Sequence, residues 1–162
     1  MVNHPANSLW GRQRPINNNA PQANPMANPE HQRVRLKEFK ITQLPDGRCT
    51  GRVIVAWHSG PDFIGTAKGT DSPQGQLRCA AEAAAHALEQ ATENKVALQL
   101  LAVKAIEPFD TIIVVISLEI ADVVKRFVGS CLVREQIALG AVLAVLSATN
   151  RLLGTAWGLP AP

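Results

Sequence analysis

The sequence predicts an α+β fold of two β-β-β-α repeats with pseudo-twofold symmetry, helices packed on antiparallel sheet, and an extended N-terminal arm in front. Three observations predict it. Strand patterns come in two groups of three, and each group precedes a small-residue or apolar helical pattern. The phrase "FIGTAKG" from Phe63 returns as "FVGSCLV" from Phe127, 64 residues later. The opening strands match at the same offset, and the helices match at an offset of 60, with Ala81 on Ala141.

The first 31 residues form the predicted arm, which carries five of the eleven prolines and many asparagines but no periodic apolar face. Two interpretations stay open. The arm is a disordered tail, or it is a docking segment whose anchor is Trp10, beside Leu9 and followed by Arg12 and Arg14. The predicted organisation is therefore an arm over 1–31, a duplicated domain over 32–155 and a short tail over 156–162, with repeats at about 33–94 and 95–154.

Three strands open the first repeat. "VRLKEFKITQL" from Val34 alternates and then changes parity, which predicts a strand with a bulge near Glu38–Phe39. "RCTGRVIVAWHS" follows a "PDG" turn as the second strand, and "FIGTAKG" follows a "GPD" turn as its hairpin partner. A helix comes next, because Asp71 or Ser72 suits the N-cap and Pro73 suits the first helical position. Its buried stripe should be small: Leu77, Ala80, Ala81, Ala84, Leu88 and Ala91.

The second repeat has the same order. "KVALQLLAVKAI" is a strand, "EPFD" a turn, and "TIIVVISLEI" a strand that is apolar on both parities and therefore central. "KRFVGSCLV" is the third strand, and "REQIALGAVLAVLSATNRLLG" is a helix that ends before Gly154. Gly65 and Gly129 stand at the same place in the two third strands, which predicts either a close approach of the backbone or a bulge there.

A doubled β-β-β-α unit with a third strand like "FVGSCLV" and a closing helix like "AVLAVLSATNRLL" resembles the C-terminal regulatory domain of α-isopropylmalate synthase, which is also found in citramalate synthases. The likeness covers about residues 33–154 and includes "LKEFKITQLPDGRCTGRVIVAW" and the "ATNRLL" ending. The resemblance implies a domain that dimerises and binds leucine or isoleucine between subunits as a feedback signal. In that family a separate metal-dependent TIM barrel performs catalysis, and this chain is too short to hold one.

The candidate ligand site is the loop before the first helix. Gly69, Thr70, Asp71 and Ser72 lead into a helix N-terminus, where an anion or carboxylate could bind, and we add the two repeated glycines, Gly65 and Gly129. We expect no catalytic residue, no metal and no cofactor, because the sequence has no GxSxG, P-loop or HExxH motif. His86, with Glu82 and Glu89 nearby on its helix, is expected to be a solvated face. The three cysteines lack metal spacing, and Cys79 and Cys131 should be buried thiols.

The composition argues against nucleic-acid and membrane partners. The net charge is only +3 and aromatic residues are 4%, so we do not expect nucleic-acid binding. No signal peptide is visible, and the most apolar run contains Glu119 and Asp122, so we expect a cytoplasmic protein without a membrane partner. The first expectation is a non-catalytic regulatory subunit that forms a homodimer or higher oligomer and binds a larger enzyme or complex through residues 1–31. The alternatives are a stand-alone sensor of a branched-chain amino acid, and an enzyme that uses His58 or His86.

Overall fold

The computed structural model describes residues 33–57, 60–120, 122–133 and 135–153, with only the backbone of the last three. Its first repeat consists of β1 (Val34–Gln43), β2 (Arg48–Trp57), β3 (Asp62–Thr70) and α1 (Pro73–Ala91). Its second consists of β4 (Ala97–Ile106), a 3₁₀ turn (Glu107–Phe109), β5 (Thr111–Ile120), β6 (Val123–Leu132) and α2 (Ile137–Leu153). The predicted order of elements is confirmed, although β6 begins two residues earlier than predicted. Asp122, with φ of 67°, turns the chain directly before it.

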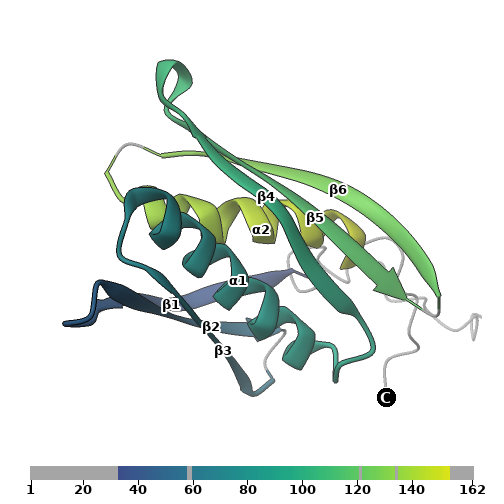
Figure 1. The fold of residues 1–162 in the computed structure, drawn as a ribbon. Helices are drawn as coiled ribbons and strands as arrows, with labels where there is room; N and C mark the ends of the chain where they lie inside the picture. Colours follow the sequence, from purple (N-terminus) through teal and green to yellow (C-terminus); the bar gives the residue numbers. More distant parts are fainter. Residues whose placement is uncertain (1–32, 58–59, 121, 134, 154–162) are drawn as a thin grey trace, which may run out of the picture.

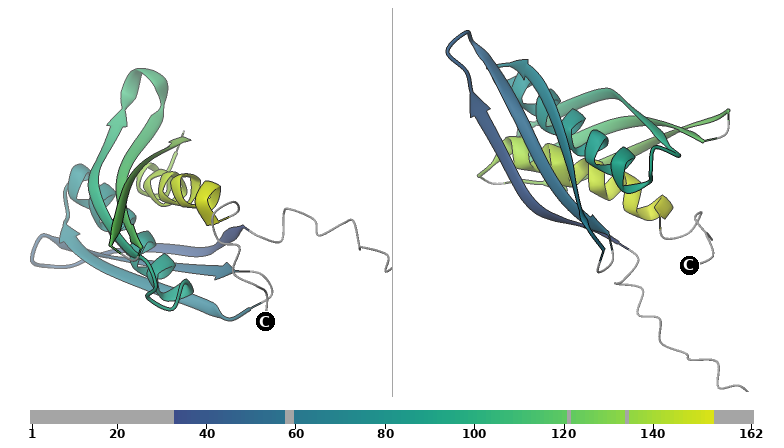
Figure 2. Two further views of the ribbon diagram at one scale, coloured as in Figure 1. Left: turned by 90° about the vertical axis from the view of Figure 1, so that its right-hand side faces the viewer. Right: turned by 90° about the horizontal axis from the view of Figure 1, so that it is seen from below.

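The molecule has three layers, with both helices between two sheets (Figures 1 and 2). Each sheet is antiparallel and three-stranded, in the orders β1-β2-β3 and β4-β5-β6, so the apolar strand β5 is central as predicted. Helix α1 packs on β2 and β3 and also contacts β4, while α2 packs on β5 and β6 and reaches β1. Each helix is thus shared by both sheets.

This placement explains why α1 is so rich in alanine. Every residue of the predicted stripe is buried, and so are Cys79, Ala83, Ala85 and Ala87, because sheets cover two sides of the helix. Small side chains let both sheets approach it closely, and the valines and isoleucine of the two central strands fill the remaining space: Val53, Val55, Val114 and Ile116, none more than 1% exposed. The predicted cap is also confirmed, since Ser72 Oγ accepts a hydrogen bond from Gly75 N at 3.1 Å and Pro73 follows it.

Gly65 and Gly129 occupy equivalent places beneath the two helices. A Cβ on Gly65 would lie 2.0 Å from the backbone oxygen of Ala83, and a Cβ on Gly129 would lie 2.0 Å from that of Ala144. The predicted close approach is confirmed. The contact also shows that the helices correspond at an offset of 61, so the offset of 60 was wrong by one residue. Alanines recur so often along α1 that letter matching alone could not fix the register.

The first strands of the two repeats carry equivalent bulges. Their ladders slip between Leu36 and Glu38 in β1 and between Leu100 and Ala102 in β4, which places the extra residues at Lys37 and Leu101, 64 positions apart. The sequence placed the first bulge one residue late and did not predict the second. The two central strands, β2 and β5, match at an offset of 61 residues. In β2, Gly51 lies opposite Ala67 of β3, and the equivalent pair in the second sheet is Ile112 of β5 opposite Cys131 of β6.

The two repeats place glycine on opposite sides of the equivalent contact between helix and sheet. In the first, Cys79 of α1 packs against strand glycines: a Cβ on Gly51 would lie 3.1 Å from Cys79 Sγ, and a Cβ on Gly69 would lie 3.0 Å from Cys79 Cβ. In the second, the glycine is on the helix, and the large residues lie on β5 and directly after β6. A Cβ on Gly140 would lie 2.1 Å from Val133 Cγ2 and 2.9 Å from Ile112 Cγ1. The same volume is filled from opposite sides.

Candidate functional site

The loop before α1 is organised by its own side chains. Asp71 Oδ1 accepts hydrogen bonds from Gln43 Nε2 at 3.1 Å and from Gln76 Nε2 at 2.5 Å. Thr70 Oγ1 lies 3.2 Å from Ser72 Oγ, the cap of the helix. These contacts tie β1, the loop and the first turn of α1 together. The side-chain oxygens of Thr70, Asp71 and Ser72 therefore already have partners within the chain.

The structure brings only part of the predicted ligand set together. Residues 69–72 are contiguous, whereas Gly65 lies in the middle of β3 beneath α1 and Gly129 lies in the other sheet beneath α2. The ligand-binding role of this set stays a prediction. The predicted partner contacts, Leu9, Trp10, Arg12 and Arg14, lie outside the described residues.

His86 contacts the neighbouring strand rather than a carboxylate. Its Nδ1 lies 2.7 Å from the carbonyl oxygen of Thr66. Glu82 is ion-paired with Arg78, with 2.8 Å between Oε1 and Nε. Glu89 accepts a hydrogen bond from the backbone N–H of Leu98 at 2.8 Å. Both carboxylates near His86 in the sequence are thus engaged with other groups. His58 lies outside the described residues.

Two of the three cysteines are fully buried. Cys79 was predicted correctly, Cys49 is also buried, and Cys131 is only partly buried. The thiol of Cys79 donates to the carbonyl oxygen of Ala67 at 3.3 Å. Burial, reinforced by the neighbouring Cys49, raises the pKa of Cys79 to about 11 from its ordinary 9.0. Such a thiol stays protonated and unreactive at neutral pH. Across the described ranges, no group of three or more His, Cys, Asp or Glu residues could hold a metal ion.

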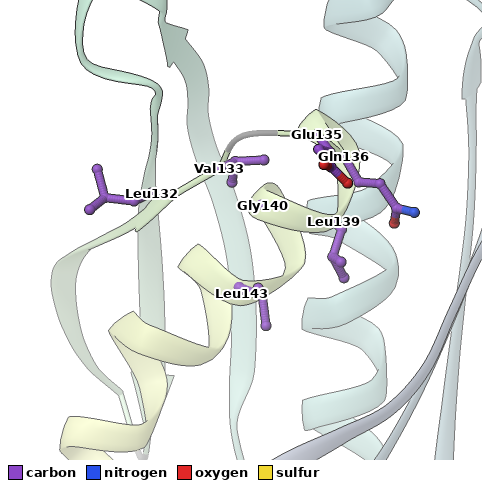
Figure 3. A pocket seen from close by; sticks show the side chains of 7 residues that line it. All are labelled: Leu132, Val133, Glu135, Gln136, Leu139, Gly140 and Leu143. Carbon is purple, nitrogen blue, oxygen red and sulfur yellow. The ribbon is translucent and has the colours of Figure 1, made fainter.

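A hollow of about 410 Å³ lies where β6 leads into α2 (Figure 3). Its walls combine apolar side chains with one carboxylate and one amide: Leu132, Val133, Glu135, Gln136, Leu139, Gly140 and Leu143. A smaller hollow of about 130 Å³ shares Val133 and extends to the β4–β5 turn. Such a surface suits an apolar group that also presents a hydrogen-bond donor. The sequence analysis placed the candidate site in the first repeat and missed this one.

The equivalent surface of the first repeat is charged. Three charged residues take the places of the three leucines that border the hollow: Lys68 for Leu132, Arg78 for Leu139 and Glu82 for Leu143. Arg78 and Glu82 form an ion pair one helical turn apart, where α2 has two leucines. The signal was present in the sequence, because the offsets of 64 and 61 align these residues. Finding this signal requires a comparison of the aligned positions at which the two repeats carry different residues.

The outer face of the first sheet is charged, whereas apolar residues take several of the equivalent positions on the second sheet. On the first sheet, Arg52 pairs with Glu38 at 3.4 Å and Lys37 pairs with Asp62 at 2.5 Å. On the second sheet, apolar residues replace four of the charged ones: Leu101 for Lys37, Ala102 for Glu38, Ile113 for Arg52 and Leu132 for Lys68. Among the described residues, nine large apolar side chains are exposed, and all but Ile64 belong to the second repeat. Within the described residues, the exposed large apolar side chains are therefore concentrated on the second repeat.

No protein-family model matches the chain, and a search of curated proteins gives no match. What is established is the class of fold: two β-β-β-α repeats with both helices between two antiparallel sheets. In the described part of the chain, neither helix has the length and apolar character needed to cross a membrane.

Proposed function

We propose that this chain is a non-catalytic assembly or regulatory subunit of the cytoplasm. It forms a homodimer or higher oligomer through the doubled α+β domain, and it binds a larger enzyme or complex through residues 1–31. The observation that carries this proposal is the exchange of charged for apolar residues on the exposed surface of the second repeat. The resemblance to the regulatory domain of α-isopropylmalate synthase, a domain that dimerises, points the same way.

The physical reason is the cost of exposed apolar surface. Monomeric proteins rarely leave large contiguous apolar patches in water, and a patch of that kind is typical of an interaction site. The first repeat has the same order of strands and helix and keeps charges at the matching positions. The fold itself therefore does not require apolar residues there, which supports association as their role.

The mass of the full-length protein in solution tests the oligomer. Light scattering after size exclusion should give twice the 17.4 kDa of one chain, or a higher multiple. A single-chain mass across a concentration series into the high micromolar range would contradict the proposal.

The arm is tested separately by co-purification from the source. The variant Trp10→Ala should keep the oligomeric mass and lose the partner, because Trp10 is the proposed anchor. Truncation to residue 32 should do the same. Retention of the same partners by the truncated protein would remove the arm from the proposal.

A second candidate function is a small-ligand sensor, and the hollow beside α2 favours it. Its volume of about 410 Å³ falls within the range of small-molecule sites, and its lining combines leucines with Glu135 and Gln136 at one end (Figure 3). An amino acid with a branched apolar side chain fits this chemistry. Thermal-shift measurements with leucine, isoleucine and valine should raise the midpoint for one of them, and Leu139→Arg with Leu143→Glu, which copies the first repeat, should abolish the shift. No shift with any of the three would dismiss this function.

A further inference from the structure

We propose that a second copy of this chain packs face to face on the outer surface of the β4-β5-β6 sheet, with the twofold axis running along β5 through Val115. This inference rests on the proposed homodimer and assigns the surface that forms it. The centre of the face is apolar, because Val115 lies directly opposite Val128 of β6 and next to Ile113. No described helix or strand covers this side of the sheet (Figures 1 and 2).

The exposure of β6 is higher than an isolated domain requires. Its outward side chains Val124, Val128 and Leu132 are 58%, 65% and 78% exposed. On the equivalent strand of the first sheet, Ile64 is 39% exposed, and Lys68 takes the position of Leu132. Burying the two valines and the leucine against another apolar face would stabilise an assembly, because it removes their apolar surface from water.

The face supplies a large part of the area that a dimer interface needs. Three strands about 4.8 Å apart, each about 33 Å long for its ten residues, give a flat area of roughly 480 Å². Projecting side chains raise the accessible area above this figure, and Leu101 and Phe109 at the margins are exposed as well. Stable dimers bury about 800 Å² per partner, so the flat face supplies somewhat more than half of that area, and a dimer through this face also has to bury its margins.

The distribution of charged residues on this face is compatible with a second copy of the same chain as the binding partner. An axis along β5 places β4 of one copy over β6 of the other, with residues of the same row in contact. The rows follow from the strand register: Ala102, Val115 and Val128 form one, and Lys104, Ile113 and Ser130 form the next. Each lysine therefore meets a serine of the partner.

The neighbouring rows are compatible in the same way. Arg126 meets Gln99, and Ile106 meets Leu132, so large apolar side chains and neutral polar ones find matching partners across the axis. Glu119 lies on β5 in the outermost row, beside the β5–β6 turn, so this axis places it opposite Glu119 of the partner, with Arg126 diagonal to it on β6. The central rows thus bring no two like charges into contact.

A matched pair of full-length variants tests the assignment. Val128→Lys places a charge in the centre of the face and should weaken the dimer at least about tenfold in dissociation constant. Ile64→Lys makes the same change at the equivalent position of the first sheet and should leave the dissociation constant unchanged. Circular dichroism on both variants confirms that the fold is retained, which we expect because both positions are exposed.

The outcomes separate this inference from the function on which it rests. A wild-type protein that is monomeric at all concentrations overturns both. A dimer that Val128→Lys leaves intact, or that Ile64→Lys dissociates instead, overturns the choice of face and leaves the homodimer standing. The axis has its own test in a Cys131→Ser background. Facing sheets lie about 10 Å apart, too far for a direct disulfide, so Ala102→Cys combined with Val128→Cys should instead be joined between chains by a short bismaleimide cross-linker. Monomeric product only would overturn the orientation.

Discussion

The side-chain amide of Asn150, near the end of α2, hydrogen-bonds both backbone groups of Val34 at the beginning of β1. Val34 N donates to Asn150 Oδ1 at 3.0 Å, and Asn150 Nδ2 donates to Val34 O at 3.2 Å. The contact of Glu89 with Leu98 N is its counterpart, since the helix residues are 61 positions apart and the strand residues 64. Each helix therefore holds the first strand of the other repeat.

Removing this contact should destabilise the fold. Val34 is only 3% exposed, so Asn150→Ala leaves a backbone donor and acceptor without their partner. We expect the free energy of unfolding to fall by about 1–3 kcal/mol. Urea unfolding measures the loss, and Ser147→Ala, a partly exposed position one turn earlier, should change it by less than about 0.5 kcal/mol. Equal effects of the two substitutions would show that the bond contributes nothing specific.

The two repeated glycines should tolerate no side chain. In Gly65→Ala and Gly129→Ala the new methyl group meets helix backbone at 2.0 Å, so helix and sheet must separate. We expect each substitution to lower the free energy of unfolding by about 3 kcal/mol or more. Ser130→Ala changes the neighbouring residue, whose side chain faces outward, and serves as the control in the same denaturation experiment. A melting temperature of Gly129→Ala close to that of the wild type would contradict the described packing.

The packing of Gly140 against Val133 can be tested with a pair of substitutions. Gly140→Ala should be destabilising, because its methyl group would meet Val133 Cγ2 at 2.1 Å. Val133→Ala removes that atom. We therefore expect the double variant to be more stable than the sum of the single effects, with a coupling of about 1 kcal/mol or more in a double-mutant cycle. Additive effects would mean that the two side chains do not share this volume.

The buried thiol of Cys79 predicts a pH dependence. Its pKa is raised to about 11 in the folded protein and is about 9.0 when the thiol is exposed. Below pH 9 the stabilising contribution is fully present, and it is lost between pH 9 and 11 because only the unfolded chain releases the proton there. The difference in unfolding free energy between wild type and Cys79→Ala should therefore shrink as the pH rises through this window. A constant difference would contradict the buried, protonated state.

Much of the fold could be predicted from the sequence because its signals are local. Alternation gave the strands, "SP" at 72–73 gave the start of α1, and the apolar strand 111–120 was identified as central. The contact of Asn150 with Val34 joins residues more than a hundred positions apart. Hydrophobic periodicity describes only neighbouring residues, so it predicts neither this contact nor the layering of the two sheets around the helices. The register of the helices was missed by one residue because alanine repeats look alike at neighbouring offsets.

The candidate site was harder to predict, because the search followed polar motifs. The loop at 69–72 attracts attention as a helix N-terminus with glycine and hydroxyl groups, yet Ser72 caps the helix and Asp71 joins two glutamines. The hollow at 132–143 is marked by leucines such as Leu139 and Leu143, which look like ordinary core residues. They become informative only when the structure aligns them with Arg78 and Glu82.

The crossed attachment of helices and strands has a consequence for how the chain can be divided. Neither half contains both partners of the Asn150–Val34 or the Glu89–Leu98 bond, so each half lacks a piece that the other supplies. The short connection between α1 and β4, where Glu93 and Asn94 take left-handed backbone angles, only tethers the two. Two polypeptides made separately, and cut at this connection, would reconstitute the domain by complementation, whereas either polypeptide alone would stay unfolded.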